Sequence, residues 1–480
     1  MAERYWIETL GCPKNQVDSD KLVGTLAVDG FEAADSPEEA DLVVVNTCAF
    51  IEAARQESID TVLALADARR AGARLVVTGC MAERYGDELA RALPEVDLVA
   101  PFGTPLTSAP SWPGLGATPV ALGRRPIGDS PVCGSGTGNV VAAPVPAFDL
   151  LNLPRPASAT PWAYVKVAEG CDRNCGFCAI PSFRGKQRSR TTTSILAEID
   201  RLGGPDGTLA EVVLVAQDLS SFALDRSIGR TELSIDGPAL AGGRPIVELV
   251  AAVAERVRWT RLLYLYPSTL DDALVEAILA TGVPYFDLSL QHVSRPLLKR
   301  MRRWGEGDRF LGRIRSIRSA EPTAAFRSSF IVGYPGETEA DHDHLLEWLE
   351  AAQLDWVGFF PFSNEAGTYA SGLVDQVPEA LVAERLRECT ELQDGITAAR
   401  RDRLSGATVE VLVDAPGEGR TYREAPEIDG IVNLPADLAV GSFAEVLITG
   451  ADGPDLFAEP ASGPHGARTR TLAAPVGTAW

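Results

Sequence analysis

The sequence predicts an α/β protein built from three units: a doubly wound parallel sheet, a partial (β/α)6 barrel and a small antiparallel β-barrel. Three observations lead to this prediction. Short apolar runs alternate with helical patterns in the first hundred residues, the alternation returns from Trp162 to about residue 392, and short strands with turns replace it after about residue 405. The chain has 480 residues, and because domains usually hold about 100–200 residues, roughly three are expected.

The first unit, residues 1–105, alternates apolar runs with longer periodic stretches. Strands are expected at residues 5–10, 42–45 and 75–78, and helices at residues 21–29, 53–71 and 83–93. Such alternation is typical of a parallel sheet covered by helices. Residues 106–156 are crowded with Gly, Pro, Ser, Thr and Ala. We expect a mobile low-complexity linker there, because this composition buries too little surface to offset the chain entropy.

The second unit, residues 157–392, contains six strand-like runs separated by helical stretches. The runs are residues 165–167, 211–215, 262–265, 286–288, 327–331 and 356–360. Residues 226–245 are expected to form a surface insertion, and residues 379–404 a long helix. In the third unit, residues 395–462, expected strands at 408–413, 430–434 and 443–448 predict the small β-barrel. Residues 463–480 are expected to be a disordered tail.

Charge and hydropathy narrow the class of protein. The net charge of −22 favours solubility and argues against broad adhesion to nucleic acid or to an anionic membrane. Neither a transmembrane run nor a secretory signal is present in the sequence. We therefore expect a cytoplasmic protein that binds no membrane. Thiols stay reduced in the cytosol, so the eight cysteines are expected to be metal ligands or buried thiols rather than disulfides.

Three cysteines fall within eight residues just past the expected strand 165–167: Cys171, Cys175 and Cys178. A loop in this position can wrap its thiolates around one small inorganic group. Structural zinc uses four ligands, and no fourth cysteine or histidine lies nearby. An iron–sulfur cluster held by three thiolates would leave one iron open to another ligand. A zinc site or a structural knot of thiols is the alternative.

A second set of cysteines, Cys12, Cys48 and Cys80, is spread through the first unit. Each follows an expected strand by one to three residues. Because the carboxyl ends of parallel strands share one edge of an open sheet, these thiols can converge there. The alternative is three buried, inert thiols. Cys133 in the linker and Cys389 in a helix fit neither set.

The spacing Cys-x3-Cys-x2-Cys, with Phe177 before the last cysteine, resembles the signature of radical S-adenosylmethionine (SAM) enzymes. The resemblance implies a [4Fe-4S] cluster whose open iron binds the amino and carboxylate groups of SAM. It also implies reductive cleavage of SAM to a 5′-deoxyadenosyl radical, and an electron donor such as flavodoxin or ferredoxin. At the barrel-strand ends, where such sites lie, the expected SAM-contacting residues are Phe177, Gln217, Gly333, Gly336 and Glu337.

Residues 11–15, 46–48 and 78–82 resemble the N-terminal domain of the methylthiotransferases. This resemblance implies a second [4Fe-4S] cluster on the first cysteine set, with an open iron that suits the sulfur to be delivered. It also implies that the C-terminal barrel is a TRAM domain. No residue is singled out as a general base.

Three stretches, residues 11–15, 168–173 and 425–430, resemble the RimO branch of this family. That branch modifies an aspartate of the small-subunit ribosomal protein S-twelve. The implied reaction inserts sulfur at the aspartate β-carbon and methylates it, with one SAM as methyl donor and another as radical source.

The third unit is strongly acidic. Between residues 404 and 460, eleven carboxylates stand against only Arg420 and Arg423. TRAM domains often bind RNA, which requires cations, whereas this surface would repel RNA and attract a basic protein. We therefore expect S-twelve to dock on this domain, with contacts that include Glu418, Glu424, Glu427 and Asp429.

Two other functions stay open at this stage. The first is a methylthiotransferase that acts on adenosine in tRNA, and the basic runs 184–190 and 299–303 could contact RNA. The second is a non-catalytic, zinc-bearing protein that binds ribosomes or RNA. Asp20, Ser289 and residues 220–222 differ from the usual family residues, which puts substrate contacts in question but leaves the radical chemistry untouched.

Overall fold

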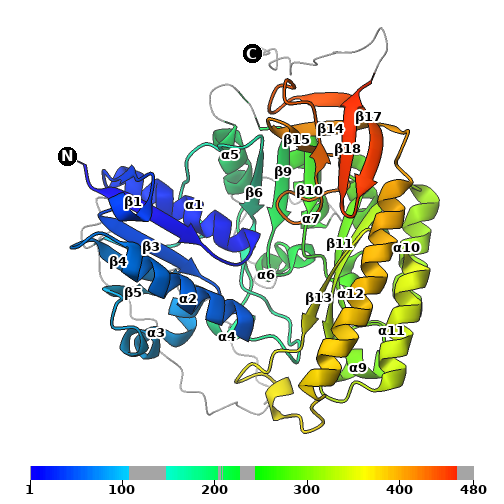
Figure 1. The fold of residues 1–480 in the computed structure, drawn as a ribbon, viewed down its shortest axis with the longest axis horizontal. Helices are drawn as coiled ribbons and strands as arrows, with labels where there is room; N and C mark the ends of the chain where they lie inside the picture. Colours follow the sequence, from blue (N-terminus) through cyan, green and yellow to red (C-terminus); the bar gives the residue numbers. More distant parts are fainter. Residues whose placement is uncertain (1, 108–147, 204–206, 208, 228–243, 462–480) are drawn as a thin grey trace.

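A computed structural model describes residues 2–107, 148–203, 207, 209–227 and 244–461. Most of the expected linker with Cys133, most of the expected surface insertion and the whole expected tail lie outside these residues. Figure 1 shows the N-terminal domain beside the central domain, and the C-terminal β-barrel at one end of the central domain.

The N-terminal domain is a five-stranded parallel sheet in the order β2-β1-β3-β4-β5, as predicted. The strands are β1 Arg4–Thr9, β2 Glu32–Ala33, β3 Leu42–Thr47, β4 Arg74–Gly79 and β5 Leu98–Ala100. The helices are α1 Pro13–Val28, α2 Glu52–Ala68 and α3 Cys80–Ala92, with a 3-10 turn, η1, at Pro37–Glu39. All six residues of β3 are buried, as expected of a central strand in a sheet covered on both faces.

Helix α1 begins earlier than the sequence predicts. Its first residue is Pro13, whose preset φ and missing N–H suit the first helical position. Hydrophobic periodicity could not mark this turn, because its buried side chains are polar ones such as Asn15 and Asp18. Strands β2 and β5 were also not predicted, because they have only two and three residues.

Six parallel strands form the central domain as two three-stranded sheets, β10-β9-β6 and β11-β12-β13. A parallel bridge from Leu265 to Leu288 connects the two sheets, which gives the predicted partial barrel. The strands are β6 Trp162–Lys166, β9 Glu211–Val215, β10 Trp259–Leu262, β11 Tyr285–Gln291, β12 Ala325–Val332 and β13 Trp356–Pro361. A short antiparallel pair, β7 Ala168–Glu169 and β8 Arg188–Ser189, follows β6.

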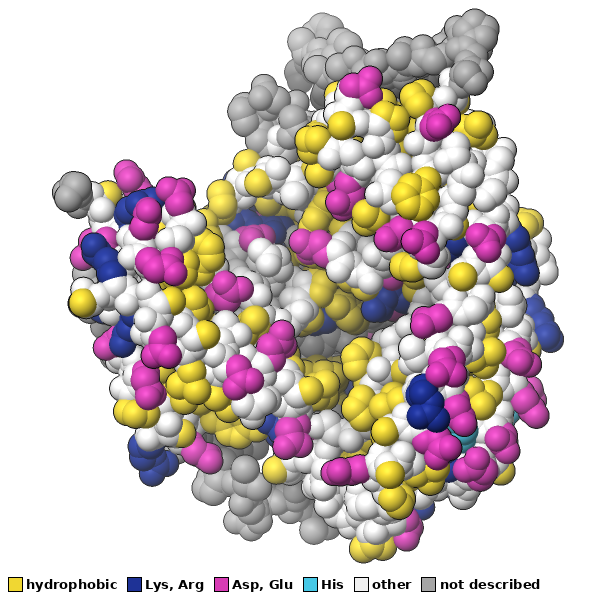
Figure 2. All heavy atoms as spheres, viewed as in Figure 1, with side chains coloured by type: hydrophobic (Ala, Val, Ile, Leu, Met, Phe, Trp, Pro, Cys, Tyr) yellow, Lys and Arg dark blue, Asp and Glu magenta, His cyan; other side chains and the backbone are white. Residues whose placement is uncertain are grey.

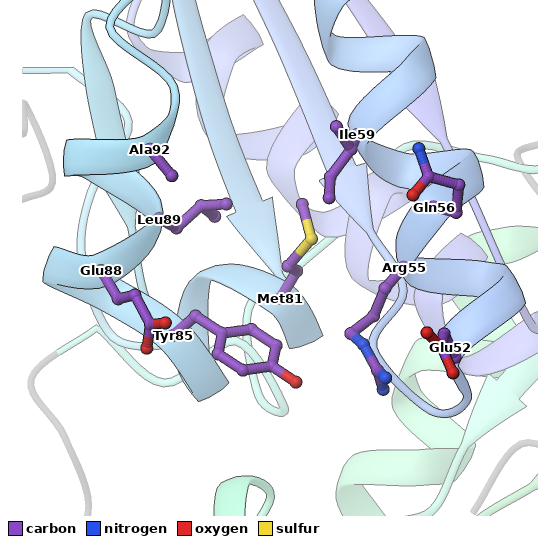
Figure 3. A pocket seen from close by; sticks show the side chains of 9 residues that line it. All are labelled: Glu52, Arg55, Gln56, Ile59, Met81, Tyr85, Glu88, Leu89 and Ala92. Carbon is purple, nitrogen blue, oxygen red and sulfur yellow. The ribbon is translucent and has the colours of Figure 1, made fainter. Parts of the chain in front are cut away.

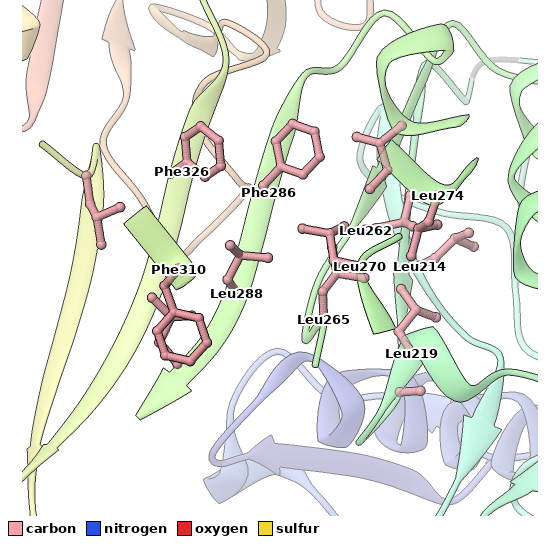
Figure 4. Close-up of a cluster of buried hydrophobic side chains, with 14 of the residues drawn as sticks. Leu214, Leu219, Leu262, Leu265, Leu270, Leu274, Phe286, Leu288, Phe310 and Phe326 are labelled. Atoms are coloured by element: carbon pink, nitrogen blue, oxygen red, sulfur yellow. The ribbon is translucent and has the colours of Figure 1, made fainter. Parts of the chain in front are cut away.

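Helices surround these strands, and leucine and phenylalanine side chains fill the interior (Figure 4). The helices are α4 Ile180–Phe183, α5 Thr192–Leu202, α6 Leu224–Ser227, α7 Pro245–Ala254, α8 Asp272–Ala280, α9 Arg295–Arg300, α10 Gly307–Ala320, α11 Glu339–Ala352 and α12 Glu379–Asp402. The 3-10 turns are η2 Leu219–Ser221, η3 Pro267–Thr269 and η4 Ala370–Gly372. Within the described part of the chain, no helix has the length and apolar character needed to cross a membrane.

The C-terminal domain is a closed five-stranded barrel in the order β14-β15-β16-β18-β17. Its strands are β14 Thr408–Ala415, β15 Glu418–Arg420, β16 Val432–Asn433, β17 Phe443–Asp452 and β18 Asp455–Pro460. Every pair is antiparallel except β16 with β18, which is parallel. The barrel interior is made of small branched side chains such as Val411, Val446 and Ile448.

A buried ion-pair network fastens the C-terminal barrel to the central domain. Glu211 on β9 is fully buried and binds Arg261 of β10 at 2.7 Å and Arg420 of β15 at 2.8 Å. Strand β10 begins at Trp259, before the predicted start, because the Glu211 carboxylate compensates the charge of Arg261 inside the sheet. Apolar patterning cannot reveal such a strand position.

The end of the expected linker nearest the central domain belongs to the packed structure. Arg155 is buried and binds Glu198 at 2.9 Å and Asp20 of α1 at 2.7 Å. The Lys21 ammonium also donates to the Leu151 carbonyl at 2.5 Å. These contacts hold the N-terminal domain against the central domain, and they give Asp20 a structural partner.

Candidate functional site

The first cysteine set lies at one edge of the N-terminal sheet. Cys12 caps the start of α1 after β1, Cys48 follows β3, and Cys80 begins α3 directly after β4. The three strands are parallel neighbours, so their carboxyl ends share this edge, as the sequence predicts.

Asn15 joins the three loops that carry these thiols. Its side-chain amide donates to the Leu10 carbonyl at 2.8 Å and to the Thr47 carbonyl at 3.1 Å, and its Oδ1 lies 3.7 Å from the Cys80 sulfur. Gly11 has a φ of +99°, and a Cβ there would lie 3.1 Å from the Cys48 sulfur. The loops therefore approach one another too closely for a side chain at position 11.

Arg184 contacts the Cys80 thiol from the central domain. Its Nη2 and Nε donate to the Cys80 sulfur at 3.0 and 3.3 Å, and Nη2 also donates to Asn15 Oδ1 at 2.6 Å. Its Nη1 binds Glu169 at 2.8 Å, and the side chain is only 4% exposed. The sequence placed Arg184 in a basic run and gave it no such role, because Cys80 and Asn15 lie more than a hundred residues away in the chain.

Burial and cations act in opposite directions on the first thiol set. Burial raises the pKa of Cys48 to about 12 and also raises the pKa of Cys80, against the nearby Arg184. Burial raises the pKa of Cys12 too, but the charges of Lys14 and Arg184 outweigh it, so that pKa is lowered. The cations therefore favour the thiolate form, which is the metal-binding form of cysteine.

The second set lies on the loop that follows β7. Gly170 has a φ of +78°, and a Cβ there would lie 2.2 Å from the Lys186 carbonyl. Next to it, the Cys171 N–H donates to the Gly185 carbonyl at 3.1 Å. Gly176 fixes the other end of the loop, because its N–H donates to the Met301 carbonyl and its carbonyl accepts from the Ala370 N–H, both at 2.7 Å.

Arg303 stands beside the second set as Arg184 stands beside the first. Its Nη1 donates to the Cys175 sulfur at 3.4 Å. Burial raises the pKa of Cys171 to about 11 and that of Cys178 to about 12, and the Arg303 charge opposes the second shift. Each set thus has an arginine side chain that donates to a thiol sulfur.

The two sets lie near each other because one short segment connects them. Ala179 and Phe183, directly after Cys178, are buried in the hydrophobic core of the N-terminal domain. Glu169, two residues before Cys171, binds the same Arg184 that contacts Cys80. The loop that carries the second set is therefore fastened to the domain that carries the first.

The spacing of the thiols bears on the group they can hold. Among the residues that the structure describes, no three His, Cys, Asp or Glu side chains are arranged to hold one metal ion. In a four-iron cluster each cysteine binds a different iron, so the sulfurs stand wider apart than the ligands of one ion. Thiolates are the usual ligands of such clusters, and each set has a nearby arginine that offsets thiolate charge.

The five expected SAM-contacting residues occupy different surroundings. Phe177 packs against the central core, and the Gln217 side chain donates to Glu169 at 2.8 Å. Gly333 and Gly336 have φ values of +80° and +86°. Glu337 accepts from the Gly333 N–H at 2.7 Å and binds Arg385 at 3.0 Å. The Glu337 carboxylate therefore stabilises the turn at residues 333–337 and pairs with Arg385.

The surface of the described residues has pockets and a hollow. A pocket of about 310 Å³ opens between α2 and α3 (Figure 3), and another of about 420 Å³ includes Gly336 and Glu337. None of the six cysteines lines either pocket. Figure 2 shows a hollow between the N-terminal domain and the rest of the molecule, with Lys and Arg side chains inside it and Asp and Glu side chains around it.

Comparisons with known proteins match all three domains. Residues 4–101 match an uncharacterized protein family, UPF0004, residues 165–349 match the radical SAM superfamily, and residues 406–460 match the TRAM domain. A protein of Salinispora tropica named ribosomal protein uS12 methylthiotransferase RimO is 41% identical, with 95% of each chain covered. Its namesake in Moorella thermoacetica is 40% identical, with 93% of this chain and 96% of that protein covered. The chain belongs to the RimO family of methylthiotransferases.

The solved structures that resemble this RimO-family chain include more distant proteins. A radical SAM methyltransferase, TsrM, from Kitasatospora setae is 13% identical, with a TM-score of 0.42, 92% of this chain and 84% of that chain covered. This likeness is too weak to carry an argument about the site. The radical SAM match itself makes SAM and a [4Fe-4S] cluster the cofactors of the central domain in this RimO-family protein.

The prediction that four TRAM-domain carboxylates face a partner is wrong for two of them. Glu424 is fully buried and binds Arg401 of α12. The Asp429 side chain is 2% exposed, lies 3.4 Å from Arg327 and accepts from Tyr285 at 2.5 Å. Both carboxylates fasten the TRAM domain to the central domain. Counting charges could not reveal this, because the arginines lie outside residues 404–460.

Proposed function

We propose that this protein adds a methylthio group to the β-carbon of an aspartate in ribosomal protein uS12. The observation that carries the proposal is the pair of three-cysteine sets fastened together through Arg184. RimO-family relatives that cover 95% of the chain support the same function. A ribosomal-protein substrate also implies a cytoplasmic enzyme.

The six cysteines have two separate roles in this proposal. Cys171, Cys175 and Cys178 hold a [4Fe-4S] cluster that binds SAM, and Cys12, Cys48 and Cys80 hold a second one. When bound, these groups supply a 5′-deoxyadenosyl radical that removes hydrogen and a sulfur that replaces it. A one-electron donor such as flavodoxin or ferredoxin supplies the reducing equivalents.

Protein side chains shape the space between the two sets. Arg184 and Arg303 donate to thiol sulfurs, and such charge-assisted contacts stabilise thiolates. Buried Ala179 and Phe183 exclude water from one side of the segment that connects the sets. Exclusion of water protects reactive intermediates from side reactions. Of the five residues expected to contact SAM, we propose Phe177, which lies on the second loop, and Gln217, which donates to Glu169 beside that loop.

The TRAM domain offers uS12 a smaller acidic surface than the sequence suggests. Its exposed carboxylates in the described part of the chain are Glu427, Asp437, Glu445, Asp452 and Glu459. Arg420 is buried in the network with Glu211, and Arg423 donates to the Thr323 carbonyl. These five carboxylates therefore dominate the exposed charge, and we propose that they steer a basic ribosomal protein by long-range attraction.

Reconstitution tests the proposal. The parent protein, loaded with iron and sulfide and given SAM, a reductant and purified uS12, should convert one aspartate to its methylthio derivative. Parallel reactions should contain tRNA in place of uS12. If tRNA adenosine is modified and uS12 is not, the proposed substrate is wrong. If the protein contains zinc instead of the iron and sulfide of about two clusters, the proposed radical reaction is wrong.

A further inference from the structure

Lys14 reaches from the N-terminal domain to the mouth of the central barrel. It lies on the first turn of α1, two residues after Cys12, and its Nζ is 3.2 Å from the centroid of the Tyr264 ring. Tyr264 follows β10 with a left-handed φ of +64°, and its N–H donates to Asp287 at 2.9 Å. The ammonium group therefore lies where the first cysteine set meets the strand ends that face the second.

No carboxylate pairs with this ammonium group within the described residues, although Lys14 is only 8% exposed. The Cys12 thiolate acts on the Lys14 charge more strongly than any carboxylate, and the carboxylates that act on it are Asp287 and Glu169. Asp287 already binds Arg327 at 3.1 Å, and Glu169 binds Lys166 and Arg184 at 2.7 and 2.8 Å.

An aromatic face compensates only part of the cost of burying such a charge. The Lys14 ammonium group thus offsets charge at Cys12 and has no carboxylate partner of its own among the described residues.

We propose that Lys14 binds the carboxylate of the aspartate that receives the methylthio group. This inference rests on the proposed function and adds a specificity residue to it. An ammonium donates up to three hydrogen bonds to a carboxylate, and the bound side chain would present its β-carbon between Cys12 and the second set. A neutral adenine base could not replace this contact, because it leaves the cation unpaired.

The same contact could in principle serve the carboxylate of SAM, so the test separates the two sources. Four full-length proteins are compared after iron loading: the parent, Lys14→Gln, Lys14→Arg and, as a charge-matched control, Lys299→Gln, which changes an exposed residue of α9. Each is titrated anaerobically with uS12, with uS12 whose target aspartate is replaced by asparagine, and with SAM alone. Iron and sulfide are measured for every protein.

The parent should bind uS12 at least about tenfold more tightly than the asparagine form, as expected for loss of one hydrogen-bonded charge pair. Lys14→Gln should bind both forms equally, Lys14→Arg should recover part of the preference, and Lys299→Gln should behave as the parent. SAM affinity and iron content should match the parent in all variants.

Three results would overturn the assignment. In the first, Lys14→Gln keeps the parent's preference for aspartate. In the second, it weakens SAM binding instead. In the third, it loses the iron of the first set, which would make Lys14 a support for Cys12. A parent protein that does not modify uS12 at all would instead reject the proposed function, and this outcome is recognised before any variant is compared.

Discussion

Replacing Arg184 with glutamine removes the cation that contacts the Cys80 sulfur. Two N–H donors at 3.0 and 3.3 Å are lost, together with an ion pair to Glu169 at 2.8 Å. Net charge and hydrogen bonds to sulfur set the reduction potential of an iron–sulfur cluster. We therefore expect the cluster of the first set to become harder to reduce, while the second cluster keeps its potential.

The size of the shift follows from Coulomb's law. One unit charge at about 4–7 Å, with an effective dielectric constant of about 20, contributes roughly 2–4 kcal/mol, which corresponds to about 100–180 mV for one electron. Redox titration followed by electron paramagnetic resonance measures this quantity. The titration is done in the Cys175→Ala background, so that the signal comes from the first set.

Arg184→Lys is the matched control because it keeps the charge and loses the planar pair of donors. Arg184→Lys should therefore restore most of the reduction potential of the cluster, but not both of the hydrogen bonds to the Cys80 sulfur. An Arg184→Gln protein with full iron content and an unchanged potential would show that Arg184 does not act on this cluster. Thermal denaturation distinguishes this result from general unfolding.

The remaining predictions concern the division of labour and the stability of the fold. Cys175→Ala should abolish SAM cleavage to 5′-deoxyadenosine, whereas Cys48→Ala should retain cleavage and lose sulfur insertion, as measured by chromatography of both products. Glu211→Gln leaves two buried arginines uncompensated, so urea denaturation should show a loss of about 3–5 kcal/mol in the free energy of unfolding. Burial lowers the pKa of His292 to about 3, below its unfolded value of about 6.5. The unfolded chain therefore binds the extra proton first, and stability should fall by up to about 1.4 kcal/mol per pH unit as pH drops from 6.5 towards 3. His292→Asn should remove this slope, and exposed His344→Asn should keep it.

The location of the first cysteine set at one edge of the sheet could be predicted, because each of its cysteines follows a strand of a parallel sheet. Cys12, Cys48 and Cys80 follow parallel strands, and parallel strands end at one edge. The spacing of the second set is a local feature of one loop, so it too is visible in the sequence. Neither prediction required knowledge of a contact between distant segments.

Residues whose role depends on distant partners could not be predicted. Arg184 looked like part of a basic run, and only folding brings it to Cys80. Glu424 and Asp429 looked like surface charges, and only folding buries them against arginines from other elements. Lys14 lies in the stretch 11–15 that resembles the family, but its position over Tyr264 depends on the contact between two domains. Composition and spacing contain no record of these contacts.

Mass spectrometry of uS12 and tRNA from cells that lack this gene tests the central claim most directly. Cells with the gene should contain uS12 that carries one methylthio group on an aspartate, and cells without it should contain only the unmodified protein, with tRNA modification unchanged. A plasmid with the parent gene should restore the modification, and a Cys48→Ala version should not. Fully modified uS12 in the deletion strain, or a loss confined to methylthioadenosine in tRNA, would contradict the account.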